Sequence, residues 1–161
     1  MSLILPGVSY ETHIVVQTRK GTNIPNAQLH EISAYERNSY TLFDKDYPLV
    51  IKRMHGSPVY NCHGMTFASR RTCVFRDEDV QVILRDDGYA EVSLEHVKPG
   101  DVVLYFEDGS IEHSGIVVDV PRTRPLMPTV CSKWAKYSEV IHSANDCPYK
   151  LMQRKYYRVM E

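Results

Sequence analysis

Two side chains in this 161-residue sequence have the chemistry of a nucleophile and its base, Cys62 and His113. Ser57-Pro58 predicts a turn before the cysteine, and Gly64 after it predicts a close approach of the backbone to another segment. The apolar residues between Met65 and Ala68 predict a buried helix that starts at the cysteine. A helix N-terminus favours negative charge and offers unpaired backbone N–H groups. A thiol placed there ionises more readily, and an oxyanion can be bound beside it. Cys62 therefore occupies a position suited to a nucleophile.

The base that such a cysteine needs is offered by His113, which lies early in the second strand of a predicted hairpin. Asp108-Gly109 is a strong turn signal between two apolar runs, Val102 to Phe106 and Ile111 to Asp119. Because side chains alternate along a strand, we expect His113 to share one face with Gly115. The hairpin would present the imidazole from one face of a sheet.

Catalysis competes with two other interpretations of these residues. An isolated cysteine is usually a small buried apolar residue. Zinc binding is the other interpretation, because Cys62, His63, His113 and Cys131 carry suitable ligand atoms. No Cys-x-x-Cys or His-x-x-x-His spacing supports a metal site, so we expect neither a metal nor another cofactor. The four cysteines are also spread too widely to indicate a disulfide framework.

The composition predicts one globular domain. Hydrophobic residues make up 43% of the chain and charged residues 24%, which suffices for a sizeable core. The formal net charge of −1 gives no electrostatic footprint for nucleic acid or an anionic membrane, so neither partner is expected. The apolar stretch from Leu3 to Val8 is short and contains Pro6 and Gly7, which argues against a signal peptide or a membrane anchor. We therefore expect a protein that stays in the cytoplasm, or is exported without a general secretory signal.

The first part of the chain shows the weakest pattern. From Met1 to about Pro48 we expect an irregular arm with a strand at Thr12 to Gln17. Leu29 to Leu42 fits either a short amphipathic helix or a pair of strands, and its periodicity does not distinguish them. A further strand within Tyr47 to Met54 would lead the chain into the turn before Cys62.

The remaining segments predict two helices followed by antiparallel strands. The helices run from Cys62 to about Thr72 and from Arg76 to about Arg85. Besides the hairpin, strands are expected at Tyr89 to Leu94, Thr129 to Trp134 and Lys150 to Val159. Helices that precede a run of antiparallel strands indicate the α+β class.

The segments around both residues resemble a known family. Tyr60-Asn61-Cys62-His63-Gly64 resembles the Asp-Cys-Ser-Gly element of NlpC-type cysteine hydrolases, with Asn61 and His63 in place of aspartate and serine. Gly100 to Phe106 and His113 to Val118 resemble that family's Gly-Asp-Leu-Val-Phe-Phe and His-Val-Gly-Ile elements. Ser132-Lys133-Trp134 resembles a segment of a bacterial and phage branch. This papain-like superfamily includes bacterial cell-wall endopeptidases and, more distantly, the CHAP amidases.

The resemblance implies a papain-like α+β fold in which N-terminal helices pack on a central antiparallel sheet. It implies a single domain over residues 1–161, with an irregular N-terminal arm at 1–55 and a catalytic core at 56–161. It also implies that Cys62 is the nucleophile and that His113 is the general base.

In the family a third polar residue on the next strand orients the histidine. By strand position it falls on Ser132, with its neighbour Lys133 and the later His142 as alternatives. Tyr60 resembles the family's tyrosine that binds the oxyanion together with the backbone N–H of Cys62, and packing is an equal alternative for this side chain.

Asn61 and His63 flank the nucleophile and are assigned to the binding site with Tyr60. If the helix begins at Cys62, His63 should point away from the thiol, so we expect it at the wall or rim of the cleft. The other histidines outside the motifs lack partners in their segments and are expected at the surface.

These assignments predict a cysteine peptidase or amidase that cleaves an amide bond through a Cys62 thioacyl-enzyme, with His113 as base. The substrate would be a peptide or another amide, and peptidoglycan stem peptides are one candidate. Two alternatives stay open: a non-catalytic binding module on the same scaffold, and a deamidase or acyltransferase with the same Cys-His pair. Hydrolysis and transfer share their motifs, because the acceptor leaves no spacing signature.

Overall fold

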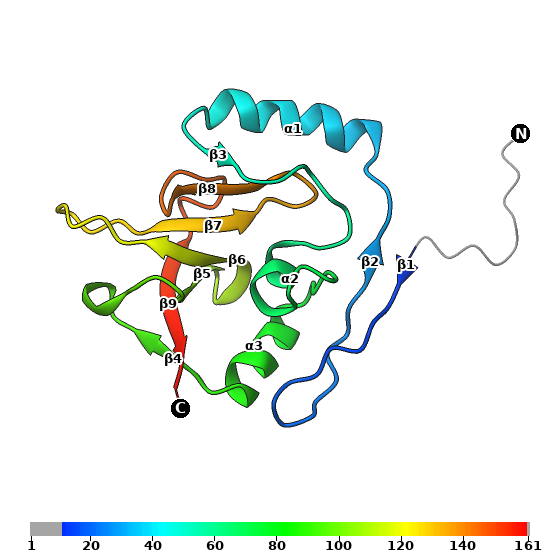
Figure 1. The fold of residues 1–161 in the computed structure, drawn as a ribbon, viewed down its shortest axis with the longest axis horizontal. Helices are drawn as coiled ribbons and strands as arrows, with labels where there is room; N and C mark the ends of the chain where they lie inside the picture. The colour runs from blue at the N-terminus through cyan, green and yellow to red at the C-terminus, as the bar shows by residue number, and fades with distance from the viewer. Residues whose placement is uncertain (1–10, 161) are drawn as a thin grey trace, which may run out of the picture.

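A seven-stranded antiparallel sheet forms the centre of the computed structural model, which describes residues 11–160. The strand order is β3-β8-β7-β6-β5-β9-β4 (Figure 1). The strands are β3 (Ile51–Lys52), β4 (Tyr89–Val92), β5 (Val102–Glu107), β6 (Ser110–Asp119), β7 (Thr129–Lys133), β8 (Glu139–Ser143) and β9 (Gln153–Val159). With the helices below, the sheet confirms the predicted α+β class. The predicted absence of a signal peptide concerns Leu3 to Val8, which lie outside the described residues.

The N-terminal part is more regular than predicted. β1 (Glu11–Thr12) and β2 (Gln28–Leu29) form a short two-stranded sheet, so the strand expected from Thr12 to Gln17 is wrong beyond its first residue. The segment from Leu29 to Leu42 fitted either a helix or a pair of strands, and most of it belongs to a 13-residue helix, α1 (Ala34–Asp46). Ser33 and Glu36 form a capping box, which satisfies backbone N–H groups at the helix start and explains why it begins there.

α1 lies along the β3–β8 end of the sheet (Figure 1). One side of the helix carries aromatic residues, and its Phe43 contacts the rings of Trp134 and Tyr137 at centroid distances of 5.4 Å and 5.2 Å. Both contacts have the edge-on geometry that aromatic pairs prefer. The helix is therefore attached to the chain segment that follows β7.

The helix of the proposed nucleophile, α2 (Cys62–Phe67), is shorter than predicted. The chain leaves it through Ser69 and Arg70, which adopt positive φ angles of 53° and 62° that a helix cannot continue. It then folds back so closely that a Cβ atom on Gly64 would lie 1.7 Å from the Thr72 carbonyl oxygen. The predicted close backbone approach at Gly64 is confirmed, but the expected continuation to Thr72 is wrong.

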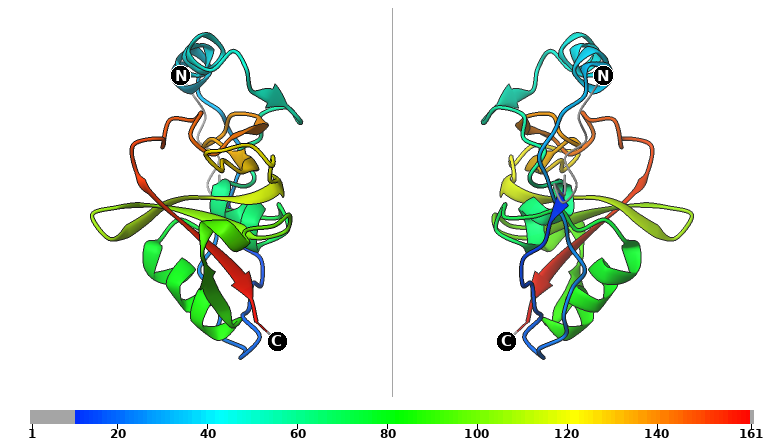
Figure 2. Two further views of the ribbon diagram at one scale, coloured as in Figure 1. Left: turned by 90° about the vertical axis from the view of Figure 1, so that its left-hand side faces the viewer. Right: turned by 90° about the vertical axis from the view of Figure 1, so that its right-hand side faces the viewer.

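The other helical segments are α3 (Asp77–Asp86), close to its predicted bounds, and a short 3₁₀ helix, η1 (Leu94–His96). Both α2 and α3 contact β6. The sheet is strongly twisted, so that β9 crosses the direction of β5 and β6 obliquely (Figure 2). Within residues 11–160, no helix combines the length and the apolarity that crossing a membrane requires.

The two faces of the sheet carry separate apolar clusters. Leu104 of β5 packs with Val80 of α3 on one face. Val103 and Tyr105 pack on the other face, in the cluster that contains Trp134. The predicted hairpin of β5 and β6 therefore contributes to both halves of the core.

A β-bulge in this hairpin sets the direction of His113. Tyr105 pairs with His113 and Phe106 pairs with Ile111, so Glu112 is the extra residue on β6. Without the bulge, Ile111 and His113 would share a face, because they are two residues apart. With it, Ile111 joins the α3 cluster, whereas His113 lies beside Tyr105 on the opposite face.

The close approach at Gly64 generates the first prediction. We expect Gly64→Ala to lower the free energy of unfolding by at least about 3 kcal/mol, because the new Cβ overlaps backbone and cannot be accommodated by a rotamer change. Urea unfolding followed by circular dichroism measures this. The control is Gly109→Ala in the β5–β6 turn, where no atom lies within 4 Å of a new Cβ and only the φ of 81° penalises alanine. That control should lose about 1 kcal/mol. Equal losses for both variants would contradict the proposed packing.

Candidate active site

Cys62 is the first residue of α2, which contacts β6 and β7 in the middle of the sheet. Asn61 caps this helix. Its Oδ1 accepts hydrogen bonds from the backbone N–H groups of Gly64 (2.9 Å) and Val74 (3.1 Å), and its Nδ2 donates to the Val74 carbonyl (2.7 Å). Asn61 was assigned to the binding site, but its side chain holds the helix start against the segment that follows the helix.

The Cys62 thiol is buried, with 8% of the residue exposed, and lies within electrostatic reach of two imidazoles. Burial by itself would raise the pKa of the thiol, but His63 and His113 outweigh it and hold the pKa well below its ordinary value. Burial raises the pKa of the other cysteines, which are Cys73, Cys131 and Cys147. Of the four cysteines, Cys62 is the one that favours the thiolate.

His113 is fully buried and is brought to the cysteine as the sequence predicts. Its ring stacks on that of Tyr149 at a centroid distance of 3.8 Å and an interplanar angle of 8°. The imidazole lowers the pKa of the Cys62 thiol, yet neither of its nitrogens has a hydrogen-bond partner of normal geometry among residues 11–160. The two residues therefore meet without a well-formed hydrogen bond between them.

His63 faces the interior and lies beside Cys62, so the expectation that it points away from the thiol is wrong. The residue is 3% exposed, and its Nδ1 lies 2.8 Å from the Ser114 hydroxyl oxygen on β6. Burial acts to lower the pKa of this imidazole, but the neighbouring Cys62 raises it above the ordinary value. The side chain turns inward because β6 offers a polar partner, which the helix pattern alone did not reveal.

Ser132 does not orient His113 in this structure. Its hydroxyl oxygen lies 2.7 Å from His142 Nε2 and accepts a hydrogen bond from Trp134 Nε1 at 3.1 Å. His142 Nδ1 donates to the Ser143 carbonyl at 2.7 Å, so both of its nitrogens are also engaged. Burial lowers the pKa of His142 to about 4, which keeps the ring neutral near pH 7. Two of the three residues predicted for the third position, Ser132 and His142, therefore bond each other instead of His113.

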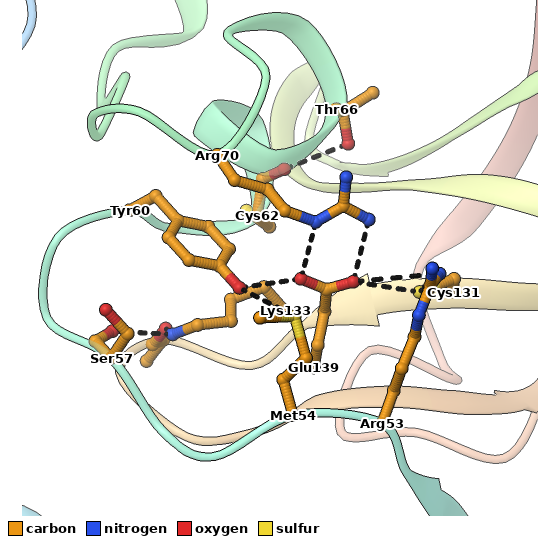
Figure 3. Close-up of polar contacts among 11 residues, drawn as sticks. Arg53, Met54, Ser57, Tyr60, Cys62, Thr66, Arg70, Cys131, Lys133 and Glu139 are labelled. Atoms are coloured by element: carbon orange, nitrogen blue, oxygen red, sulfur yellow. Dashed lines mark hydrogen bonds and ion pairs between the residues drawn. The ribbon is translucent and has the colours of Figure 1, made fainter.

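The Tyr60 hydroxyl is committed to another partner as well. It donates to Glu139 at 2.6 Å, and the guanidinium of Arg70 donates to both oxygens of the same buried carboxylate at 2.8 Å. Figure 3 shows this cluster beside the start of α2, where Cys62 lies. With its proton directed at Glu139, Tyr60 does not supply the expected oxyanion donor, and the backbone N–H of Cys62 is the donor that remains.

Lys133 is a further buried charge close to the site. Its Nζ donates to the carbonyls of Ser57 (2.8 Å) and Ala135 (2.6 Å) and lies 5.0 Å from the centre of the Tyr60 ring. Burial lowers the pKa of this ammonium group to about 8. Lys133 therefore stabilises the turn before Cys62 through its hydrogen bond to Ser57. Like Ser132, it does not bond the imidazole of His113.

Sequence reasoning missed three contributors to the site. Tyr149 covers His113, Ser114 bonds His63, and Glu139 joins Tyr60 to Arg70. No local signal identified Ser114, because it points to the face of its strand opposite the proposed base. None marks Glu139 either, whose ionic partner lies 69 residues away in sequence.

No three His, Cys, Asp or Glu side chains within the described range converge in a way that could hold a metal ion. Cys62 lies within electrostatic reach of His63 and His113, but these three side chains do not form such a group, so the zinc interpretation lacks a ligand set in this range.

Comparisons with known proteins add no family to this geometry. A scan of protein-family models finds no match, and searches of curated proteins and of solved structures find none either. The similarity to NlpC-type hydrolases thus rests on the motifs around Cys62 and His113, and the papain-like fold stays a prediction.

The buried Glu139 generates a prediction about acid stability. Burial alone would raise the pKa of this carboxyl, but the hydrogen bonds from Arg70 and Tyr60 lower it from 4.5 to about 2. A carboxylate with a depressed pKa in the folded state stabilises the protein above its unfolded pKa, and this stabilisation is lost as the pH falls from about 4.5 toward 2. We expect Glu139→Gln to remove this part of the pH dependence.

The measurement is the free energy of unfolding in urea, taken between pH 2 and 7 for the wild type and the variant. The difference between the two proteins should shrink as the pH falls through this window. Glu112→Gln is the matched control, because Glu112 is an exposed acid on β6. A constant difference between wild type and Glu139→Gln across the pH range would contradict the charged state of the cluster.

Proposed function

We propose that the protein is a cysteine hydrolase, a peptidase or amidase that cleaves an amide bond through a thioacyl-enzyme on Cys62. The observation that carries this proposal is the selective depression of the Cys62 thiol pKa, at a helix start where two imidazoles outweigh the cost of burial. A thiolate beside imidazoles in a buried site is the arrangement on which nucleophilic cysteine catalysis depends.

The reaction follows from these groups. The thiol proton passes to an imidazole, a role that the family resemblance gives to His113, and the sulfur attacks the substrate carbonyl. The tetrahedral oxyanion accepts a hydrogen bond from the backbone N–H of Cys62. When the C–N bond breaks, the imidazolium returns its proton to the leaving amine. Water then hydrolyses the thioester, which releases a carboxylic acid and the free thiol.

The order of the elements supports a papain-like scaffold for this chemistry. A nucleophile helix, α2, precedes a Gly-Asp turn at Gly100-Asp101 and the strand β6 that carries His113. The proposed substrate is a peptide or another amide, with peptidoglycan stem peptides as one candidate. A deamidase or acyltransferase would use the same acyl-enzyme with a different donor or acceptor.

A non-catalytic binding module is a second candidate, and one observation favours it. His113 is 0% exposed and stacks on the ring of Tyr149, and Cys62 is only 8% exposed, so the pair is enclosed by its surroundings. A protein whose packing never opens at this place would keep the Cys-His pair as an inert part of its core.

Selective alkylation separates the two candidates. We expect iodoacetamide near neutral pH to modify Cys62 at least about tenfold faster than the other cysteines, because only its thiol has a lowered pKa. Mass spectrometry of the digested protein gives the rate at each site. Equal or slower labelling of Cys62 would favour the binding module.

Cys62→Ala tests the hydrolase itself. It should abolish hydrolysis of amide substrates, screened as muropeptides and as protein substrates, while the circular dichroism spectrum stays that of the wild type. Cys147→Ala, which changes another buried cysteine whose pKa is raised, is the matched control and should keep hydrolysis. Full activity in Cys62→Ala would refute the proposal.

A further inference from the structure

The hydrogen bonds around His63 determine which of its nitrogens carries a proton. Three contacts run from the ring back to the start of its own helix: His63 Nδ1 to Ser114 Oγ (2.8 Å), Ser114 Oγ to Thr66 Oγ1 (3.0 Å), and Thr66 Oγ1 to the Cys62 carbonyl (2.9 Å). Each hydroxyl has one proton to donate, whereas the carbonyl can only accept. The donor and acceptor in each of the three hydrogen bonds therefore follow from the Cys62 carbonyl at the end of the series.

Thr66 must donate its proton to the Cys62 carbonyl, so its oxygen accepts the proton of Ser114. The Ser114 proton is then used, and its oxygen can only accept from His63. His63 Nδ1 therefore carries a hydrogen. In the neutral imidazole this leaves Nε2 with a lone pair and no proton.

We propose that His63 is a catalytic base for Cys62, which takes the thiol proton on Nε2, and that Ser114 and Thr66 are positioning residues that keep Nδ1 protonated. The inference rests on the proposed cysteine chemistry and deepens it. His113 has no comparable support, because neither of its nitrogens has a hydrogen-bond partner of normal geometry among the described residues.

The protons balance in this scheme. In acylation, the thiol proton moves from Cys62 Sγ to His63 Nε2 and then to the leaving amine as the C–N bond breaks. The Nδ1 proton stays on the ring throughout. In the second step, His63 Nε2 takes a proton from water while the water oxygen bonds the thioester carbon, and that proton returns to the sulfur as the C–S bond breaks.

Histidine tautomers provide a test that does not depend on activity. Long-range ¹H–¹⁵N correlation spectra distinguish Nδ1–H from Nε2–H rings, and are best recorded in Cys62→Ala, where no thiol can transfer its proton to His63. We expect His63 in the Nδ1–H form at a pH at which it is neutral. His142 is an internal reference, because its Nδ1 donates to the Ser143 carbonyl. An Nε2–H ring at His63 would overturn the proposal.

Two hydroxyl variants test the positioning residues. Adding Ser114→Ala or Thr66→Val to Cys62→Ala should shift His63 toward the Nε2–H form, while Thr66→Ser, which keeps the hydroxyl, should restore Nδ1–H. The His142 signal should be unchanged in each variant, which shows that the fold is intact. An unchanged His63 tautomer in both Ser114→Ala and Thr66→Val would contradict the chain of hydrogen bonds.

Thiolate absorbance near 240 nm, taken as the difference from Cys62→Ala, tests the base itself. We expect His63→Gln to move the midpoint of the thiolate titration upward by about one pH unit, which is a tenfold decrease in the ionisation constant of Cys62. Ser114→Ala should cause a smaller upward shift that Ser114→Thr reverses. If His63→Gln keeps the thiolate and His113→Gln removes it, His113 is the base. If the tautomer and thiolate measurements give the expected results but no amide substrate is hydrolysed, only the proposed hydrolase function is refuted.

Discussion

The site depends on one balance: the free energy lost by burying an ionised sulfur against the free energy gained from the imidazoles beside it. Burial raises the pKa of Cys62, and only His63 and His113 reverse this effect. The local architecture places these two rings. The Asn61 cap and the close approach at Gly64 fix the start of α2, and the bulge in β6 turns His113 away from the α3 cluster. Geometry and charge therefore have a common origin in the packing of α2 on β6.

A second balance holds the surroundings of the helix in place. Glu139 on β8 is fully buried, and it is kept ionised by Arg70, which lies in the left-handed turn after α2, and by Tyr60 just before the helix. One carboxylate thus connects both ends of the nucleophile segment to the sheet (Figure 3). Removing one partner of such a pair costs far more than the pair contributes, because a buried charge is left alone. The cluster of Tyr60, Arg70 and Glu139 therefore fixes the position of α2 on the sheet.

The sequence predicted what local signals determine and missed what distant partners determine. The Asp108-Gly109 turn and the glycine at 64 have local causes, and both predictions are confirmed. The hydroxyl of Tyr60 was misread because its acceptor lies 79 residues away, on a strand that was not predicted. The same missing strand, β8, carries His142, so the bond between Ser132 and His142 could not be foreseen. Periodicity identifies faces of elements, but it does not identify the partners that meet across them.

The enclosure of the thiol also has a consequence for its oxidation. A thiolate of low pKa is the form of cysteine that peroxides oxidise most readily, first to sulfenic acid and then irreversibly to the higher acids. Cys62 is only 8% exposed, and the stacked Tyr149 ring covers the neighbouring imidazole. An oxidant therefore reaches the sulfur only through this small exposed fraction or when the surrounding packing opens. The enclosure slows oxidation of the sulfur, so the lifetime of the reduced nucleophile depends on the packing around it.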